Sequence, residues 1–324
     1  MQTLRSNWFI VVLSMVIVGV ILHHLLQTTS PVNTATKPAD SLWIAPSLFS
    51  DVETAGTERQ LVAYGEALIV HTAQYLGPKG SVSQTTNGMN CQNCHLDGGT
   101  RAWGNNYSAV ASTYPKFRER SGQVENIYKR VNDCLERSLN GLPLDTASRE
   151  MQAIATYIKW LGKSVPKGTK PTGAGLEKLP FPDRAASPLI GKKLYEEKCA
   201  SCHLNTGEGV LAANGNMYQY PPLWGQHSYN DGAGLYRLSN FASYIKNNMP
   251  YNQASHLNPA LQNIEAWDVA AYVNSMPRPH LNQYADYPNI AKKPFDTPYG
   301  PYADAFNEQQ HKYGPYKPIV AAGK

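Results

Sequence analysis

The pentad Cys-x-x-Cys-His occurs twice in this chain of 324 residues, as CQNCH at 91–95 and as CASCH at 199–203. This pentad is the attachment signature of a c-type haem, in which two thiols bond to the haem vinyl groups and the adjacent histidine ligates the iron. The sequence therefore predicts two covalent haem c groups. The predicted attachment residues are Cys91, Cys94, Cys199 and Cys202, and the predicted iron ligands are His95 and His203.

Half of a zinc site or a thioredoxin-like dithiol would also contain Cys-x-x-Cys. Zinc ribbons, however, place their two pairs roughly 15–20 residues apart, whereas His95 and His203 lie 108 residues apart. Neither alternative explains why a histidine follows both pairs. Net charge is only +5 and no dense basic run occurs, so nucleic acid is not an expected partner.

The two pentads belong to an internal repeat. A helix-like segment precedes each pentad, at 58–77 and at 187–203, and an amphipathic segment containing a tyrosine closes each half. The two tyrosines, Tyr157 and Tyr272, lie 115 residues apart. The pattern predicts a mainly α fold of two tandem cytochrome c-type haem domains, at 55–168 and 169–280.

The same offset of 115 residues relates Met249 to Cys134, the one cysteine outside the pentads. Met249 precedes a proline between the second pentad and the last helix, where small cytochromes c place their distal sulfur ligand. The repeat therefore nominates Met249 as the sixth ligand of the second haem and Cys134 as that of the first. Met217 is an alternative ligand or lines the second haem, and Met151 is expected in the core.

Cys134 could be an inert core thiol, since free cysteine is often a small buried residue. Its neighbours are polar and charged, however, and on a helix Arg130, Cys134 and Ser138 would follow one another along one face. A guanidinium beside a thiol favours the thiolate. Together with Arg118 and Arg120 just upstream, these residues predict an anion pocket that opens on a thiolate-ligated iron.

The chain resembles a known family, the tetrathionate-forming thiosulfate dehydrogenases, which are dihaem cytochromes c. The resemblance covers about residues 55–280 and rests on NCQNCHLDGGT (90–100), CLERSLNG (134–141), PPLWG with SYNDGAG (221–234) and IKNNMP (245–250). It implies oxidation of two thiosulfates to tetrathionate, or the reverse reaction, with the electrons passed to an external carrier. It also implies His95 and Cys134 as ligands of the first haem, His203 and Met249 as ligands of the second.

The family's remaining substrate-contacting residues match Arg120, Arg130 and Ser138, so the expected catalytic set is Cys134, Arg120, Arg130 and Ser138. Some relatives have a lysine directly before the methionine that exchanges with it on the second haem. This chain has Asn248 there, which cannot act as an amine ligand. We therefore expect His/Met ligation of the second haem in both redox states.

Three other functions remain open from the sequence. A membrane-tethered dihaem electron carrier without its own substrate would leave the aligned Cys134 unexplained. A dihaem peroxidase would need acid–base residues at a displaceable ligand, for which His227 and His256 are the available, though more ordinary surface, histidines. A cytochrome subunit of a multienzyme sulfur-oxidising complex would use Cys134 as an attachment point for a separate carrier protein.

Both ends of the chain differ from the haem-binding halves. Trp8–Leu26 is apolar and long enough for one span, which predicts an inner-membrane anchor or a signal segment within 1–28, followed by a linker at 29–54. Covalent haem attachment predicts a periplasmic location and a periplasmic cytochrome or similar carrier as electron partner. The stretch 281–324, rich in proline and tyrosine, predicts an extended tail that wraps the domains.

Overall fold

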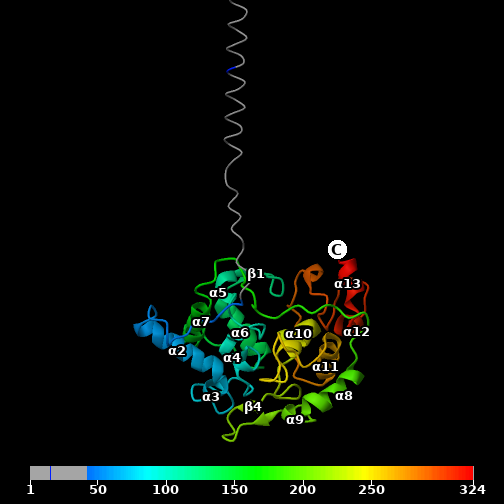
Figure 1. The fold of residues 1–324 in the computed structure, drawn as a ribbon, viewed down its shortest axis with the longest axis horizontal. Coiled ribbons are helices and arrows are strands. Elements are labelled where there is room, and N and C mark those ends of the chain that lie inside the picture. Colours follow the sequence, from blue (N-terminus) through cyan, green and yellow to red (C-terminus); the bar gives the residue numbers. More distant parts are fainter. Residues whose placement is uncertain (1–14, 16–41, 324) are drawn as a thin grey trace, which may run out of the picture. The chain divides into compact units, whose positions relative to one another are not determined.

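The computed structural model describes residue 15 and residues 42–323. Apart from Met15, the predicted anchor Trp8–Leu26 therefore lies outside the described residues. Within 42–323, no helix has both the length and the apolar character needed to cross a membrane. These residues form one compact, mainly helical unit (Figure 1).

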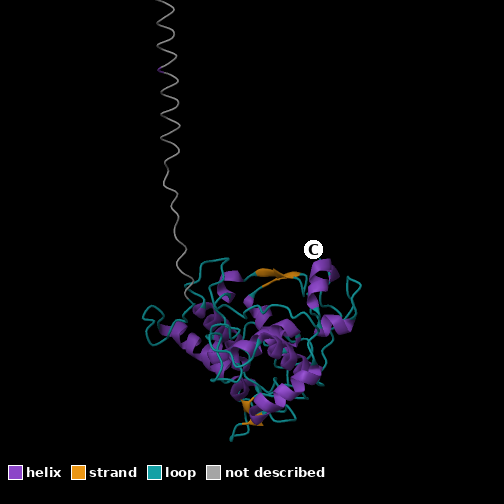
Figure 2. Ribbon diagram, turned by 45° about the vertical axis from the view of Figure 1, so that its right-hand side comes forward, coloured by secondary structure: helices purple, strands orange, loops and turns teal. Residues whose placement is uncertain are grey.

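The first half contains these elements: α2 (Gly56–Val70), α3 (Thr72–Leu76), η1 (Cys91–Asn93), α4 (Leu96–Gly99), α5 (Val110–Thr113), β1 (Lys116–Arg118), β2 (Gln123–Glu125), α6 (Ile127–Arg137) and α7 (Arg149–Leu161). The second half contains these: α8 (Pro188–Lys198), α9 (Ala200–His203), β3 (Val210–Leu211), β4 (Tyr218–Tyr220), η2 (Gly234–Tyr236), α10 (Leu238–Asn248) and α11 (Asn263–Ser275). The strands pair as two antiparallel hairpins, β1–β2 and β3–β4, which lie at opposite sides of the helices (Figure 2). The predicted helical repeat is thus confirmed.

Helix starts follow from local capping. The side chain of Asn126 accepts from the Lys129 amide at the start of α6, and Ser148 and Ser187 cap α7 and α8 in the same way. Such side chains satisfy backbone donors that have no partner within the helix. The caps fix where α6 begins, and hence which residues of its sequence face inward.

Both halves are built on the same crossing of their first and last long helices. In the first half, α2 packs on α7, and a Cβ at Gly65 would lie 2.1 Å from the carbonyl oxygen of Ala153. In the second half, α8 packs on α11, and a Cβ at Gly191 would lie 1.9 Å from the carbonyl oxygen of Asp268. Ala153 and Asp268 lie 115 residues apart, which is the offset of the repeat. Each crossing thus depends on a glycine that lets two helix backbones touch.

We expect Gly65→Ala and Gly191→Ala each to lower the free energy of unfolding by about 1–3 kcal/mol or more, because the added methyl group meets backbone that cannot move aside. Urea denaturation of the purified holoprotein, followed by tryptophan fluorescence, measures the change. Gly234→Ala is the matched control, since a Cβ there meets nothing within 4 Å. Equal stability of all three variants would show that the helices do not cross at these glycines.

The two halves are joined by direct contacts between the Met249 loop and the loop that follows the first pentad. Asn248 donates to the carbonyl oxygen of Trp103 at 3.1 Å, and Tyr251 donates to a carboxylate oxygen of Asp97 at 2.7 Å. Five residues before Met249, Tyr244 donates to the carbonyl oxygen of Asn93, inside the pentad, at 2.7 Å. The segment that carries the predicted ligand of the second haem is therefore fixed to the attachment loop of the first.

The C-terminal stretch differs in part from the extended tail that the sequence predicts. It contains η3 (Ile290–Lys292) and two helices, α12 (Glu308–Tyr313) and α13 (Tyr316–Ala322). Tyr316 is fully buried among the rings of Phe181, Trp267 and Phe295. The sequence did not predict these short helices because the stretch is rich in proline. Their apolar residues are buried by packing on the second half of the chain, which no local pattern shows.

One residue of this stretch, Asp296, is completely buried and caps α10. Its carboxylate accepts from the Nε of Arg237 at 2.8 Å and from the backbone amide of Ser239 at 3.2 Å, and it also accepts from the Ser239 hydroxyl. A carboxylate at a helix N-terminus is favoured by the helix dipole and by the free amides there. The C-terminal stretch thus holds the helix that leads to Met249.

Candidate haem and anion site

A cavity of about 330 Å³ lies in the first half of the chain, and it brings together the residues of the first pentad with Cys134. Cys91, Cys94 and His95 line one part of it. Arg130, Cys134 and Ser138, predicted to share a helix face, line it as well. Its apolar walls include Ile69, Leu135, Leu139, Ile154 and Ile158.

The donor set around this cavity fits a covalently bound haem. The Nδ1 of His95 lies 2.5 Å from the carbonyl oxygen of Asn105, so this nitrogen carries the proton and Nε2 is left for iron. The imidazole also stacks on the Tyr107 ring at a centroid distance of 4.4 Å. Burial lowers the pKa of His95 to about 4, which keeps the ring neutral and able to ligate at neutral pH.

Helix α6 places a cysteine and an arginine of the cavity side by side. Arg130 and Cys134 are one turn apart within α6, and Ser138 follows at its C-cap. The pKa of Arg130 is raised, chiefly by the charge of Cys134 and despite burial. The structure thus brings a cationic guanidinium and the Cys134 sulfur to the same cavity.

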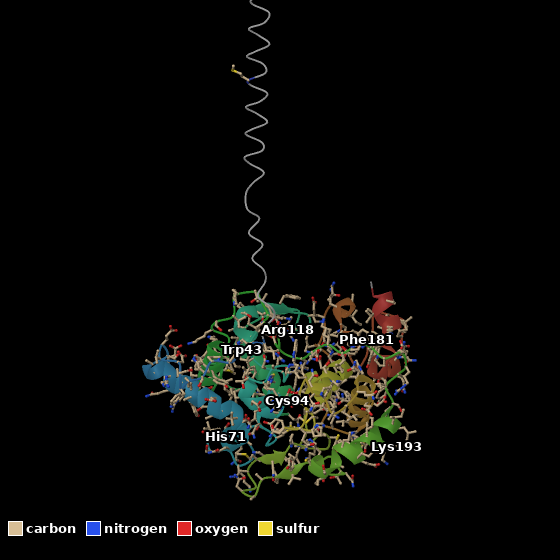
Figure 3. All side chains as sticks on the ribbon, viewed as in Figure 1. Trp43, His71, Cys94, Arg118, Phe181 and Lys193 are labelled. Carbon is tan, nitrogen blue, oxygen red and sulfur yellow. The ribbon has the colours of Figure 1, made fainter. Side chains whose placement is uncertain are left out.

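The cavity is strongly cationic. Lys116, Arg118, Arg130 and Lys170 line it, and no aspartate or glutamate is among the described residues that do so. Lys116 and Arg118 are alternate residues of β1, and side chains two apart in a strand point to the same side. Figure 3 shows Cys94 among the helices and Arg118 toward the side on which β1 lies. The arrangement suits a small anion of high charge.

Arg120, a member of the predicted catalytic set, is placed differently from Arg130 and Ser138. It is not among the residues that line the cavity. Its Nη1 donates to the carbonyl oxygen of Gly232 at 2.7 Å, and its guanidinium lies 3.8 Å from Asp286 of the C-terminal stretch. Asp286 also accepts two bonds from Arg137 at the end of α6, at 2.9 and 2.7 Å. Arg120 thus belongs, with Asp286 and Arg137, to a set of charged residues outside the cavity lining that anchors the C-terminal end of α6.

The second pentad has an equivalent histidine. The Nδ1 of His203 lies 2.8 Å from the carbonyl oxygen of Pro221, and burial lowers the pKa of this imidazole. Met249 is the C-cap of α10 and packs, with Cys199 and Tyr218, against a core cluster that comes mostly from the second half. Met249 therefore sits just past its helix, whereas Cys134 lies inside α6. The two halves therefore share the same order of elements, but the two predicted sulfur ligands lie at different positions relative to their helices.

The other residues that the sequence raised are also placed. Met151 is completely buried in α7, as expected for a core residue. Met217 is half-buried just before β4. His227 is exposed at the edge of a second cavity, of about 520 Å³, which Leu204 and Trp224 also line, and His256 is half-buried. Trp224 packs against the rings of Tyr195 and Tyr272.

Sequence reasoning missed Lys116 and Lys170 as candidate binding residues. For Lys116 a signal existed, because the alternation of basic residues in KFR (116–118) predicts two cations on one side of a strand. For Lys170 no local signal exists, since it reaches the cavity from the segment after α7.

Comparison with known proteins agrees with this geometry. Residues 81–166 match the family model described as SoxA/TsdA, cytochrome c domain, and residues 189–277 match the model described as Cytochrome c. Each matched stretch contains one pentad, so the chain carries two covalent haem c groups.

Thiosulfate dehydrogenase of Psychrobacter arcticus is 41% identical over 206 residues, which are 63% of this chain and 61% of that protein. Thiosulfate dehydrogenase of Stutzerimonas stutzeri is 35% identical over 245 residues, which are 76% of each chain. The structure of thiosulfate dehydrogenase (TsdBA) from Marichromatium purpuratum, in its as-isolated form, matches with a TM-score of 0.66 and 33% identity, over 74% of this chain and 50% of that chain. The chain thus spans about three fifths of the first relative and half of the solved one. With both haem-binding halves matched, the chain belongs to the thiosulfate dehydrogenase family of c-type cytochromes.

Proposed function

We propose that this protein oxidises two thiosulfate ions to tetrathionate at the cavity that contains His95 and Cys134. The observation that carries the proposal is Cys134 itself, which lines a cationic cavity together with the first pentad. A plain electron carrier would need neither this sulfur nor a cavity lined by four cations. The curated relatives named above are thiosulfate dehydrogenases, and their activity agrees with the proposal.

In the proposed reaction, two thiosulfate dianions lose one electron each and one S–S bond forms between their terminal sulfurs. Tetrathionate leaves as a dianion, and no proton is released. Two haems, held by His95 with Cys134 and by His203 with Met249, would supply the redox chemistry and take up the two electrons, since a thiolate ligand lowers the potential of a haem and a methionine ligand raises it. The electrons then pass to a periplasmic cytochrome or a similar acceptor.

The residues of α6 have distinct roles in this proposal. Arg130 donates to the sulfonate oxygens of the bound thiosulfate, which its planar guanidinium can do through two parallel bonds. Ser138 offers a hydroxyl on the same side of the cavity. Cys134 lies where the terminal sulfur is proposed to bind. In the reverse direction its thiolate can attack the central S–S bond of tetrathionate, which bonds one thiosulfate unit to Cys134 and releases the other as thiosulfate.

Arg120 acts in this proposal from outside the cavity. Together with Arg137 it is bound by Asp286, and it holds the Gly232 backbone. It therefore positions α6 and the loop at Gly232, while Arg118, which lines the cavity, takes over direct contact with the anion.

The cellular setting is also a proposal. Covalent haem attachment fits a periplasmic protein. The segment Trp8–Leu26, outside the described residues apart from Met15, is proposed to hold it at the inner membrane.

The test is an anaerobic optical titration of the oxidised holoprotein with thiosulfate, with tetrathionate measured in the same sample. We expect the haem bands to become reduced while one tetrathionate appears per two electrons. If the spectrum stays oxidised, tetrathionate is added to the dithionite-reduced, desalted protein, because the reaction can run in reverse. A protein that responds in neither direction is an electron carrier, and the proposal fails.

We also expect the second haem to keep His203 and Met249 as ligands in both redox states. Asn248 has no amine, and its buried side chain is directed to the carbonyl oxygens of Trp103 and Tyr244, at 3.1 and 3.0 Å. Nuclear magnetic resonance of the reduced protein and magnetic circular dichroism of the oxidised protein report methionine ligation. An Asn248→Lys variant is the comparison. A nitrogen ligand in the unmodified oxidised protein would refute the expectation.

A further inference from the structure

The coupling of two thiosulfates requires two anion-binding positions. Both substrates are dianions, and they must be present together for the S–S bond to form. In tetrathionate the two sulfonate groups lie at opposite ends of the molecule. If the proposed function holds, the site therefore needs two groups of cations, one for each sulfonate.

The cavity contains such a second group, on the β1–β2 hairpin and on the segment after α7. Lys116 and Arg118 share the cavity side of β1, whereas Phe117 between them faces outward and is 55% exposed. Lys116 lies over the Tyr114 ring, with its Nζ 5.0 Å from the ring centroid. Lys170 reaches the same cavity from residues that follow α7.

These cations lie close together, and nearby carboxylates do not neutralise all of their charge. The pKa of Lys116 is lowered, first by burial and then by Arg118, Lys170 and Arg130. Arg118 is partly compensated by Glu125, whose Oε2 lies 3.9 Å from the Arg118 Nε and whose Oε1 accepts from Ser121. Within residues 42–323, neither Lys116 nor Lys170 forms an ion pair of 4 Å or less. Such a cluster is stabilised by an anion from outside the chain.

We propose that Lys116, Arg118 and Lys170 form a second anion subsite, which binds the sulfonate group of the second thiosulfate and one end of tetrathionate. Arg130 and Ser138 bind the first sulfonate beside Cys134. The order follows from exposure: Arg130 is half-buried on α6, whereas Lys170 is exposed to solvent. The first thiosulfate thus occupies the inner position and the second enters behind it, with the new S–S bond between the two subsites.

The test counts bound thiosulfate. Anaerobic calorimetry is carried out on the dithionite-reduced, desalted holoprotein, in which turnover is blocked because both haems already hold their electrons. We expect two thiosulfates per unmodified chain and one per chain of the Lys116→Gln/Lys170→Gln variant. In steady-state oxidation, the half-saturating thiosulfate concentration should rise roughly tenfold or more, since charge-assisted bonds are lost. Lys116→Arg/Lys170→Arg, which keeps both charges, should restore two sites.

The control is Lys192→Gln, which removes one positive charge from an exposed position on α8. It should bind two thiosulfates. A Lys116→Gln/Lys170→Gln variant that still binds two would overturn the subsite while leaving the proposed function standing. If that variant binds two but has a shifted potential or spectrum of the first haem, the lysines neutralise the haem propionates instead, and the subsite is again refuted. Absence of thiosulfate binding to the unmodified protein would remove the proposed function itself.

Discussion

Replacing Cys134 by glycine is expected to lower thiosulfate turnover by on the order of a thousandfold or more, with both haems still covalently attached. Among the described residues that line the cavity, Cys134 is the one cysteine outside the haem-attachment pentad, and in the proposed function its thiolate serves both iron and sulfur chemistry. Removing a catalytic nucleophile slows turnover far more than removing a residue that only assists binding. Turnover is measured as tetrathionate formed with an excess of a soluble electron acceptor, and haem content by mass spectrometry.

Two further variants separate the chemistry of the sulfur from the integrity of the helix. Cys134→Ser keeps a small polar side chain and should be nearly as inactive as the glycine variant, because a hydroxyl does not replace a thiolate at neutral pH. Glu136→Gln changes a half-buried residue of the same helix and should retain activity. Substantial turnover by Cys134→Gly would exclude the thiolate from the mechanism.

The second large effect is on stability. Replacing Arg237 by alanine is expected to cost roughly 3–5 kcal/mol of unfolding free energy, because it leaves the carboxylate of Asp296 buried without its cationic partner. The Asp296 side chain has no exposed surface, and Arg237 donates to it from Nε at 2.8 Å and also from Nη2. Urea denaturation of the holoprotein measures the loss, and the helix that leads to Met249 is the element we expect to fray first.

A surface ion pair provides the contrast. Lys317 pairs with Asp183, and their side chains are 58% and 92% exposed. Lys317→Ala should leave the unfolding free energy nearly unchanged, because solvent screens such pairs. Pairing Arg237→Ala with Asp296→Ala should recover part of the loss, since the buried charge is then removed. Equal effects of Arg237→Ala and Lys317→Ala would contradict the capping role of the C-terminal stretch.

The haem-binding architecture could be predicted from sequence because its determinants are local and repeated. The pentads are covalent requirements, and the offset of 115 residues relates Tyr157 to Tyr272 and Cys134 to Met249. The face shared by Arg130, Cys134 and Ser138 follows from helical periodicity alone. These are the features for which the spacing along the chain already determines the spatial relation.

The remaining features depend on contacts between distant segments. Lys170 reaches the cavity and Arg120 turns away from it because of where α7 and the C-terminal stretch pack, which no local pattern encodes. Asp296 looks like an ordinary polar residue of a proline-rich tail, yet it is buried at the start of α10. The roles of Gly65 and Gly191 could likewise be recognised only from the structure, in which they contact the backbone of Ala153 and Asp268.

The contacts that fix the Met249 loop to the attachment loop of the first haem bear on how fast charge can move. Asn248 and Tyr251 bind Trp103 and Asp97 directly, so the donor and acceptor centres are held by one shared contact surface. In the proposed reaction, electron transfer between the two haem sites would then need no search for an encounter geometry and no domain closure of the kind that limits many enzymes. Its rate would be set by a fixed tunnelling distance and would not depend on solvent viscosity.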